Sequence, residues 1–306
     1  MKLSIVTTLY RSAPTIEEFV RRVCEKAREL TDDYEVILVD DGSPDRSLEV
    51  ALNVQRSNPH LSVIELSRNF GHHKAMMTGL EHAKGDKVFL IDVDLEEPPE
   101  LLLRFQEEMQ KGKWDVVYGI QKTRKGGLIK RAGGWMGWQL ISAILPIRIP
   151  QNQSTVRLMT RSYVLELVRH KEHRTAIGGL WVITGFRQTG LLFDKSYRGR
   201  SSYSFLKRLS ALLDSVTSFS EVPLYGVLFL GLGLFLISLV VAVYLIFRKM
   251  LGMVLPGWIS VMVSVWGLGG LILLCIGLVG LYVSRIFIET KNRPYVIIRN
   301  KYDIHG

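Results

Sequence analysis

The chain has 306 residues and a formal net charge of +10, and 47% of its residues are hydrophobic. This length allows one or two domains with a sizeable core. A mean hydropathy of +0.16 is high for a soluble enzyme, because the apolar residues are concentrated in the C-terminal third. The two cysteines, Cys24 and Cys275, imply no disulfide framework, so a disulfide-stapled scaffold is excluded.

The N-terminal part of the chain alternates short apolar runs with amphipathic helical patterns. The predicted strands are Leu3–Leu9, Tyr34–Val39, Leu61–Leu66, Lys87–Ile91 and Trp114–Tyr118. The predicted helices between them are Thr15–Leu30, Ser47–Arg56, His72–Ala83 and Pro99–Gln110. This alternation is typical of an α/β fold with a mostly parallel sheet.

Acidic residues follow two of the predicted strands. Asp92, Asp94 and Glu96 come at alternate positions after the fourth strand, and Asp40 and Asp41 end the second. Ligands of open α/β sheets bind outside the carboxyl ends of strands, and Mg²⁺ or Mn²⁺ on substrate phosphates uses one or two carboxylates. The two acidic sites therefore predict a nucleotide-sugar site, one for the nucleoside and one for a metal. The alternative is that the acids after the fourth strand only cap the helix that follows at Pro98.

Two histidines begin the third predicted helix. His72 and His73 stand before Lys74, where a helix start can approach a phosphate. We favour the simpler interpretation, in which they are a solvated helix cap. A nucleic-acid interface is not favoured, because the aromatic residues accompany membrane-like segments.

Two long stretches near the C-terminus carry no charge, Val222 to Phe247 and Met250 to Ser284. Each exceeds the roughly 20 apolar residues that span a bilayer, so we expect transmembrane helices at about 225–247 and 258–284. A buried core hairpin is the alternative, but it needs a larger protein around it. Basic residues are more frequent after the second stretch than between the two, which places the N-terminal domain and both termini in the cytoplasm.

Two amphipathic segments, about 128–145 and 203–221, are expected to lie on the membrane surface, although ordinary core helices would show the same pattern. The expected organisation is a catalytic domain over residues 1–202, a juxtamembrane helix over 203–221, two spans within 222–284 and a cytoplasmic tail over 285–306. The protein is thus expected to be integral to a bacterial inner membrane. Small residues in the spans would permit a homo-oligomer.

Several motifs occur in an order that resembles a known family. They are Asp40-Asp41-Gly42-Ser43, Arg68-Asn69-Phe70-Gly71, Asp92-Val93-Asp94-Leu95, Arg157-Leu158-Met159 and Gly199-Arg200-Ser201-Ser202-Tyr203. Over nearly the whole chain, this set is similar to family 2 glycosyltransferases of the polyisoprenyl-phosphate type.

The resemblance implies a GT-A fold, a divalent metal (Mg²⁺ or Mn²⁺), a nucleotide-diphosphate sugar donor and a polyisoprenyl phosphate acceptor such as undecaprenyl phosphate. The product would serve cell-envelope glycan synthesis or modification. The residues implied for the metal are Asp92, Asp94 and Glu96. Those implied for the nucleotide sugar are Tyr10, Val39, Asp41, Asp92 and Arg200. Those implied for catalysis are Asp92, Asp94, Arg157 and Arg198.

The sequence departs from the family pattern at a few positions. Arg11 and Ser12 replace an Asn-Glu pair after Tyr10, Thr155 stands where relatives commonly have Asp, and Ser202 replaces a Lys. A catalytically silent membrane scaffold is therefore an alternative. A processive polysaccharide synthase is another, but its Gln-x-x-Arg-Trp motif does not occur here.

Overall fold

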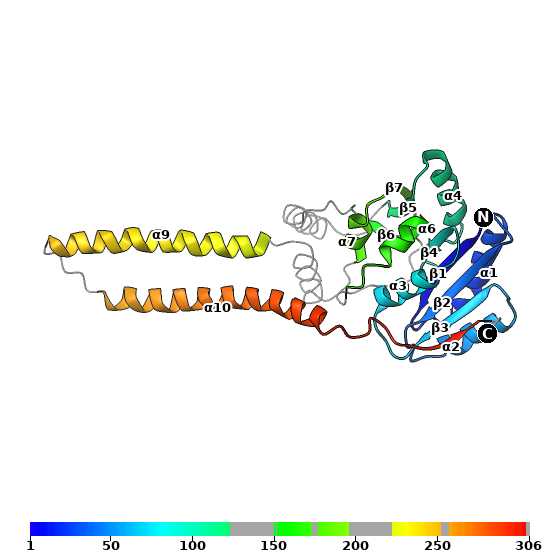
Figure 1. The fold of residues 1–306 in the computed structure, drawn as a ribbon, viewed down its shortest axis with the longest axis horizontal. Coiled ribbons are helices and arrows are strands. Elements are labelled where there is room, and N and C mark those ends of the chain that lie inside the picture. The colour runs from blue at the N-terminus through cyan, green and yellow to red at the C-terminus, as the bar shows by residue number, and fades with distance from the viewer. Residues whose placement is uncertain (123–149, 151, 173–176, 196–221, 252–256, 304–306) are drawn as a thin grey trace. The chain divides into compact units, whose positions relative to one another are not determined.

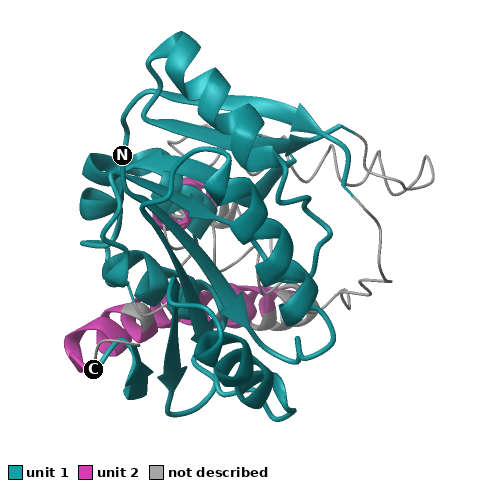
Figure 2. Cartoon of the chain, turned by 90° about the vertical axis from the view of Figure 1, so that its right-hand side faces the viewer, with its two compact units in different colours: residues 1–136, 147–205, 294–306 teal, residues 137–146, 206–293 magenta. Residues whose placement is uncertain are grey.

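The computed structural model describes residues 1–122, 150, 152–172, 177–195, 222–251 and 257–303. The chain forms two compact units, one of residues 1–136, 147–205 and 294–306 and the other of residues 137–146 and 206–293 (Figure 2). The amphipathic segments expected at 128–145 and 203–221, and the candidate residues Arg198 and Arg200, lie outside the described residues.

The first unit is built on an eight-stranded sheet of order β7-β5-β6-β4-β1-β2-β3-β8 (Figure 1). Its strands are β1 (Leu3–Leu9), β2 (Tyr34–Asp40), β3 (Leu61–Leu66), β4 (Lys87–Leu90), β5 (Val116–Gln121), β6 (Gln153–Thr160), β7 (Gln188–Phe193) and β8 (Ile298–Tyr302). The strands from β4 to β3 are parallel, as are β5 and β7, whereas β6 and β8 run antiparallel to their neighbours. The expected mostly parallel α/β sheet is therefore confirmed.

Helices pack on the sheet through alternating strand residues. The helices of this unit are α1 (Ile16–Arg28), α2 (Ser47–Arg56), α3 (His72–His82), α4 (Leu101–Gly112), α6 (Arg161–Leu167) and α7 (Ile177–Ile183). Ile5 of β1 belongs to the buried cluster that holds Phe19 of α1 and Phe105 of α4, whereas its neighbour Val6 faces α3. Because successive strand residues point to opposite faces, α3 covers the face opposite to α1 and α4.

Gly79 lets α3 lie directly on the sheet. A Cβ atom at Gly79 would stand 2.4 Å from Cγ1 of Val6 and 3.0 Å from Cγ2 of Val39. Val39, which the sequence analysis assigned to the nucleotide site, is thus buried between β2 and α3. Its side chain supports the sheet below the site and does not line the cavity described below.

The C-terminal segment differs from the expected tail. α10 (Trp258–Thr290) is followed by β8, which joins the sheet beside β3. No sequence pattern predicted this strand, because Ile298–Tyr302 is short and mostly polar and its partner lies more than 230 residues away. The elements after β5, namely β6, α6, α7 and β7, were likewise not predicted individually.

The second unit contains α9 (Val222–Met250) and α10, which include most of the two uncharged stretches of the sequence. Within the described residues, Gly267–Thr290 is long and apolar enough to cross a membrane, and Val222–Leu234 is a shorter apolar helix. Both expected helices are present. That both of them cross a membrane stays a prediction.

The close contact at Gly79 can be tested with a single methyl group. Gly79→Ala should lower the thermal unfolding midpoint of the detergent-solubilised protein, because overpacking costs about 1–3 kcal/mol and exceeds the roughly 1 kcal/mol gained in helix propensity. Gly226→Ala in α9 is the matched control, since among the described residues no atom outside its chain neighbours and its own helix backbone lies within 4 Å of its Cβ position. Circular dichroism measures the unfolding midpoints. Equal midpoints for the two variants would contradict this packing.

Candidate functional site

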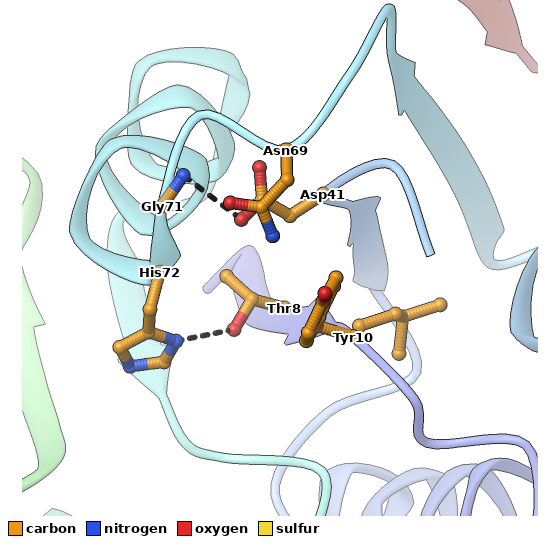
Figure 3. Close-up of a pocket in the computed structure, with 7 residues that line it drawn as sticks. Thr8, Tyr10, Asp41, Asn69, Gly71 and His72 are labelled. Atoms are coloured by element: carbon orange, nitrogen blue, oxygen red, sulfur yellow. Dashed lines mark hydrogen bonds between the residues drawn. The ribbon is translucent and has the colours of Figure 1, made fainter. Parts of the chain in front are cut away.

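A small cavity opens at the carboxyl ends of β1 and β2 (Figure 3). It has a volume of about 110 Å³ and is lined by Thr8, Leu9, Tyr10, Asp41, Asn69, Gly71 and His72. These residues come from the end of β1, the end of β2 and the segment that leads from β3 into α3. Ligand pockets usually measure about 300–1,000 Å³, so this cavity suits one part of a larger ligand.

Asp41 holds one wall of the cavity in place. Its carboxylate accepts hydrogen bonds from the backbone N–H groups of Phe70 at 2.7 Å and Gly71 at 3.0 Å. Burial raises the pKa of Asp41, and these two hydrogen bonds oppose the shift. Gly42 lets the chain after Asp41 approach the loop that carries Phe70. It has a φ of 60°, and a Cβ atom there would stand 2.4 Å from the carbonyl carbon of Arg68. The motifs around Asp41 and Phe70 are therefore one structural unit.

His72 joins this cavity to the second acidic site. Its Nδ1 lies 2.9 Å from Oγ1 of Thr8, and its Nε2 lies 3.5 Å from Oδ1 of Asp92 (Figure 3 shows the contact with Thr8). The N-cap of α3 is Gly71, and no side chain caps the helix. The helix-cap role favoured for His72 from the sequence is therefore wrong, because its ring bonds to the end of β1 instead.

The second acidic site is a tight turn after β4. Leu95 has a φ of 60°, which is uncommon for a residue other than glycine, and its side chain is buried. Asp94 accepts a hydrogen bond from the backbone N–H of Glu96 at 2.9 Å. Glu96 in turn forms an ion pair with Lys195 at 2.9 Å. Packing of Leu95 thus fixes the directions of the acids on either side of it.

Negative charge accumulates at this turn. Burial raises the pKa of Asp92 and the charge of Asp94 adds to the shift, whereas His72 and a hydrogen bond from Thr155 oppose it. Burial and the charge of Asp92 raise the pKa of Glu97 to about 8, and the hydroxyl of Ser154 donates a hydrogen bond to this carboxylate. A cation bound at the turn would relieve this repulsion.

The donor set fits a metal ion that is shared with a substrate. Among the described residues, no group of three or more His, Cys, Asp or Glu side chains is placed to hold a metal by itself. Asp92 and Asp94 supply two carboxylates, and Mg²⁺ typically binds one or two carboxylates together with substrate phosphates. Glu96, the third predicted ligand, is engaged by Lys195 in this structure. The ligand assignment itself stays a prediction.

Two further candidate residues lie in different surroundings. Arg157 is fully buried, stacks on the ring of Trp181 and donates hydrogen bonds to the carbonyl oxygens of Ser154 and Thr155. In this structure it supports the wall behind the acidic turn and does not reach the cavity. Tyr10, by contrast, is exposed and lines the cavity.

Lys195 is a site residue that the sequence analysis missed. Its ammonium contacts Glu96, and its charge acts on Asp92, Asp94 and Glu97 as well. No motif marks it, because it follows β7, a strand that joins the sheet only through long-range pairing. Its nearness to the acids is a property of the tertiary structure alone.

Comparisons with known proteins agree with this architecture. Residues 4–168 match the model of the family "Glycosyl transferase family 2". A protein of Mycobacterium tuberculosis named as a glycosyltransferase is 49% identical over 303 residues, covering 99% of this chain and 89% of the relative. The uncharacterized glycosyltransferase sll0501 of Synechocystis is 33% identical, covering 99% of this chain and 96% of the relative. The bactoprenol glucosyl transferase of Shigella phage SfV is 31% identical, covering 98% and 99%.

The mostly parallel sheet with acidic residues at its carboxyl edge is a GT-A-like α/β fold, which defines the class of protein. The chain belongs to glycosyl transferase family 2.

The role of Lys195 as a counterion leads to a stability prediction. Lys195→Met should lower the stability by more than about 1 kcal/mol, because it leaves half-buried carboxylates without a partner. Mn²⁺ should restore part of the loss. The control is Lys122→Met, which breaks an exposed ion pair with Asp194 that is worth at most about 1 kcal/mol. Thermal unfolding with and without Mn²⁺ measures both effects, and equal losses without a metal response would contradict the assignment.

Proposed function

We propose that this protein moves one sugar from a nucleotide-diphosphate sugar onto a polyisoprenyl phosphate, such as undecaprenyl phosphate, with the help of Mg²⁺ or Mn²⁺. The observation that carries the proposal is the line from the Asp41 cavity through His72 to Asp92 and Asp94. Asp41 directly follows β2, and Asp92 and Asp94 follow β4. His72 begins α3 and contacts Thr8 of β1, the strand that lies between β2 and β4 in the sheet.

The residues from the Asp41 cavity to Asp92 and Asp94 have the chemistry that a nucleotide sugar needs. The cavity suits a nucleoside, with the exposed ring of Tyr10 at its rim and the carboxylate of Asp41 on its wall. Acidic residues at such strand ends bond ribose hydroxyls in dinucleotide folds. The diphosphate would then pass His72 towards Asp92 and Asp94. A metal bound there would neutralise the charge that develops on the departing nucleoside diphosphate.

The acceptor explains why no strong general base is required. A lipid phosphate is already ionised, so one of its oxygens attacks the anomeric carbon directly. A new carbon–oxygen bond forms as the bond to the nucleoside diphosphate breaks, and the diphosphate leaves with the electron pair. Fixed cationic donors near the leaving group stabilise this change of charge, and Arg198 and Arg200 are the predicted candidates.

A membrane acceptor is supported by the second unit and by the relatives. None of the Gly267–Thr290 stretch is buried, which argues against a buried core hairpin. Large apolar side chains such as Phe229 and Leu273 are 66% and 71% exposed. Relatives named bactoprenol glucosyl transferase match this chain over nearly its full length. One substrate is thus soluble and the other stays in the bilayer.

The connectivity of the sheet supports two membrane spans. β8, after α10, pairs with β3, before α9, so both ends of the helical segment lie on the same side of any membrane. The chain between them must cross an even number of times. If α10 crosses, α9 crosses as well. The basic residues that follow the second uncharged stretch favour a cytoplasmic location for the sheet.

A donor panel tests the activity. The purified full-length protein is incubated with undecaprenyl phosphate, Mg²⁺ or Mn²⁺ and each common UDP- and GDP-sugar, and lipid products are detected by mass. Asp94→Asn should lower the rate at least about 100-fold and weaken Mn²⁺ binding measured by electron paramagnetic resonance. The exposed control Asp194→Asn should do neither. Lack of donor hydrolysis and transfer with every sugar would favour the silent scaffold.

Cysteine labelling in whole bacterial cells tests the topology. In a Cys24→Ser, Cys275→Ala background, Lys249→Cys at the C-terminal end of α9 should react with an impermeant maleimide from outside the inner membrane. Asp303→Cys, just after β8, should react only after the membrane is opened. Labelling of both positions from the same side would contradict the two-span arrangement.

A further inference from the structure

Glu65 of β3 is a buried carboxylate held entirely by the C-terminal strand. It is 5% exposed and accepts hydrogen bonds from Nη1 of Arg299 at 2.9 Å, Nδ2 of Asn300 at 3.0 Å and the hydroxyl of Tyr302 at 2.8 Å. Burial alone would raise its pKa, but these bonds and the charge of Arg299 lower it. Strand pairing uses backbone groups only, so these three side-chain hydrogen bonds come in addition to it.

Arg299 also reaches the backbone beyond β3. The pairing shifts register here, with Glu65 opposite Asn300 and Leu66 opposite Ile298, so that Arg299 is the extra residue of a bulge. Such bulges redirect side chains. Nη2 of Arg299 donates to the carbonyl oxygen of Ser67 at 2.9 Å. The Ser67 N–H donates to the carbonyl oxygen of Ile297, also at 2.9 Å.

The start of α3 is held by the same segment. Nζ of Lys74 donates to the carbonyl oxygen of Tyr295 at 3.4 Å and lies 5.0 Å from the centre of the Tyr295 ring. We name residues Tyr295–Tyr302 the C-terminal latch. The latch therefore grips the chain at Ser67 and at Lys74, on both sides of residues 68–73.

The gripped loop is a wall of the cavity. Asn69, Gly71 and His72 line it. The loop is also held by the hydrogen bonds from Phe70 and Gly71 to Asp41 and by the contacts of His72 with Thr8 and Asp92. Asp41 thus bonds the middle of this short loop, and the latch bonds the residues at its two ends. A shift of Ser67 would move Asn69 and Gly71 directly.

We infer that the C-terminal latch is a positioning element of the donor site, in which Glu65 and Arg299 set the loop that closes the nucleoside cavity. This inference rests on the proposed function. None of the latch residues lines the cavity, so their effect on it would pass through the loop. The segment that follows the membrane helices thereby contributes to recognition of the soluble substrate.

The test compares two substitutions that remove one positive charge from the same strand. Arg299→Gln loses the contacts with Glu65 and Ser67, whereas Lys301→Gln changes an exposed side chain. Arg299→Gln should raise the donor KM, and the Kd of the matching nucleoside diphosphate, by about five- to tenfold, because an ionic hydrogen bond that orders the loop is lost. Its kcat should stay within about twofold, and Lys301→Gln should behave as wild type.

A second measurement follows the loop without any substrate. Hydrogen exchange of residues 67–74 should accelerate in Arg299→Gln and stay unchanged in Lys301→Gln. Tyr302→Phe removes a hydrogen bond to Glu65 that does not involve Ser67, and it reports the stabilising effect of the strand alone. A lower unfolding midpoint with unchanged KM, Kd and loop exchange in Arg299→Gln would overturn the latch while leaving the proposed function intact. A wild-type protein that binds no nucleoside diphosphate would overturn both.

Discussion

The hydrogen bonds from Phe70 and Gly71 to Asp41 are the interaction on which the site depends. A buried carboxylate is costly unless it is bonded, and Asp41 obtains its partners from a loop that follows a different strand. This requirement brings the ends of β1, β2 and β3 together around one cavity. It also places the start of α3, with His72, above the end of β1. The shape of the cavity thus follows from the need to satisfy one acid.

Charge balance governs the neighbouring turn. Asp92, Asp94, Glu96 and Glu97 lie within a few residues of one another. The side chains that face them, the imidazole of His72 and the ammonium of Lys195, come from other elements of the fold. An excess of carboxylates of this kind would favour a further cation, as the proposed function requires. The same turn is held by packing of Leu95, which has a positive φ and a buried side chain.

The return of the chain to the sheet connects the helical unit to the sheet domain. Through β8, the residues after α10 become part of the domain that precedes α9. A tether of this form fixes the domain to both ends of the helical segment, which suits a reaction between a soluble donor and a lipid. It also explains why polar residues in β8 are useful: their partners are Glu65 and the backbone of Ser67, not a hydrophobic core.

The sequence by itself determined the elements whose signals are local. Periodicity identified β1 to β5 and α1 to α4 closely, and the acids at Asp41, Asp92 and Asp94 were recognised because they follow apolar strands. Tertiary structure alone decided the role of His72, the approach of Lys195, the burial of Arg157 and the pairing of β8. Each of these depends on contacts between residues far apart in the chain, and neither composition nor periodicity records which distant segments meet.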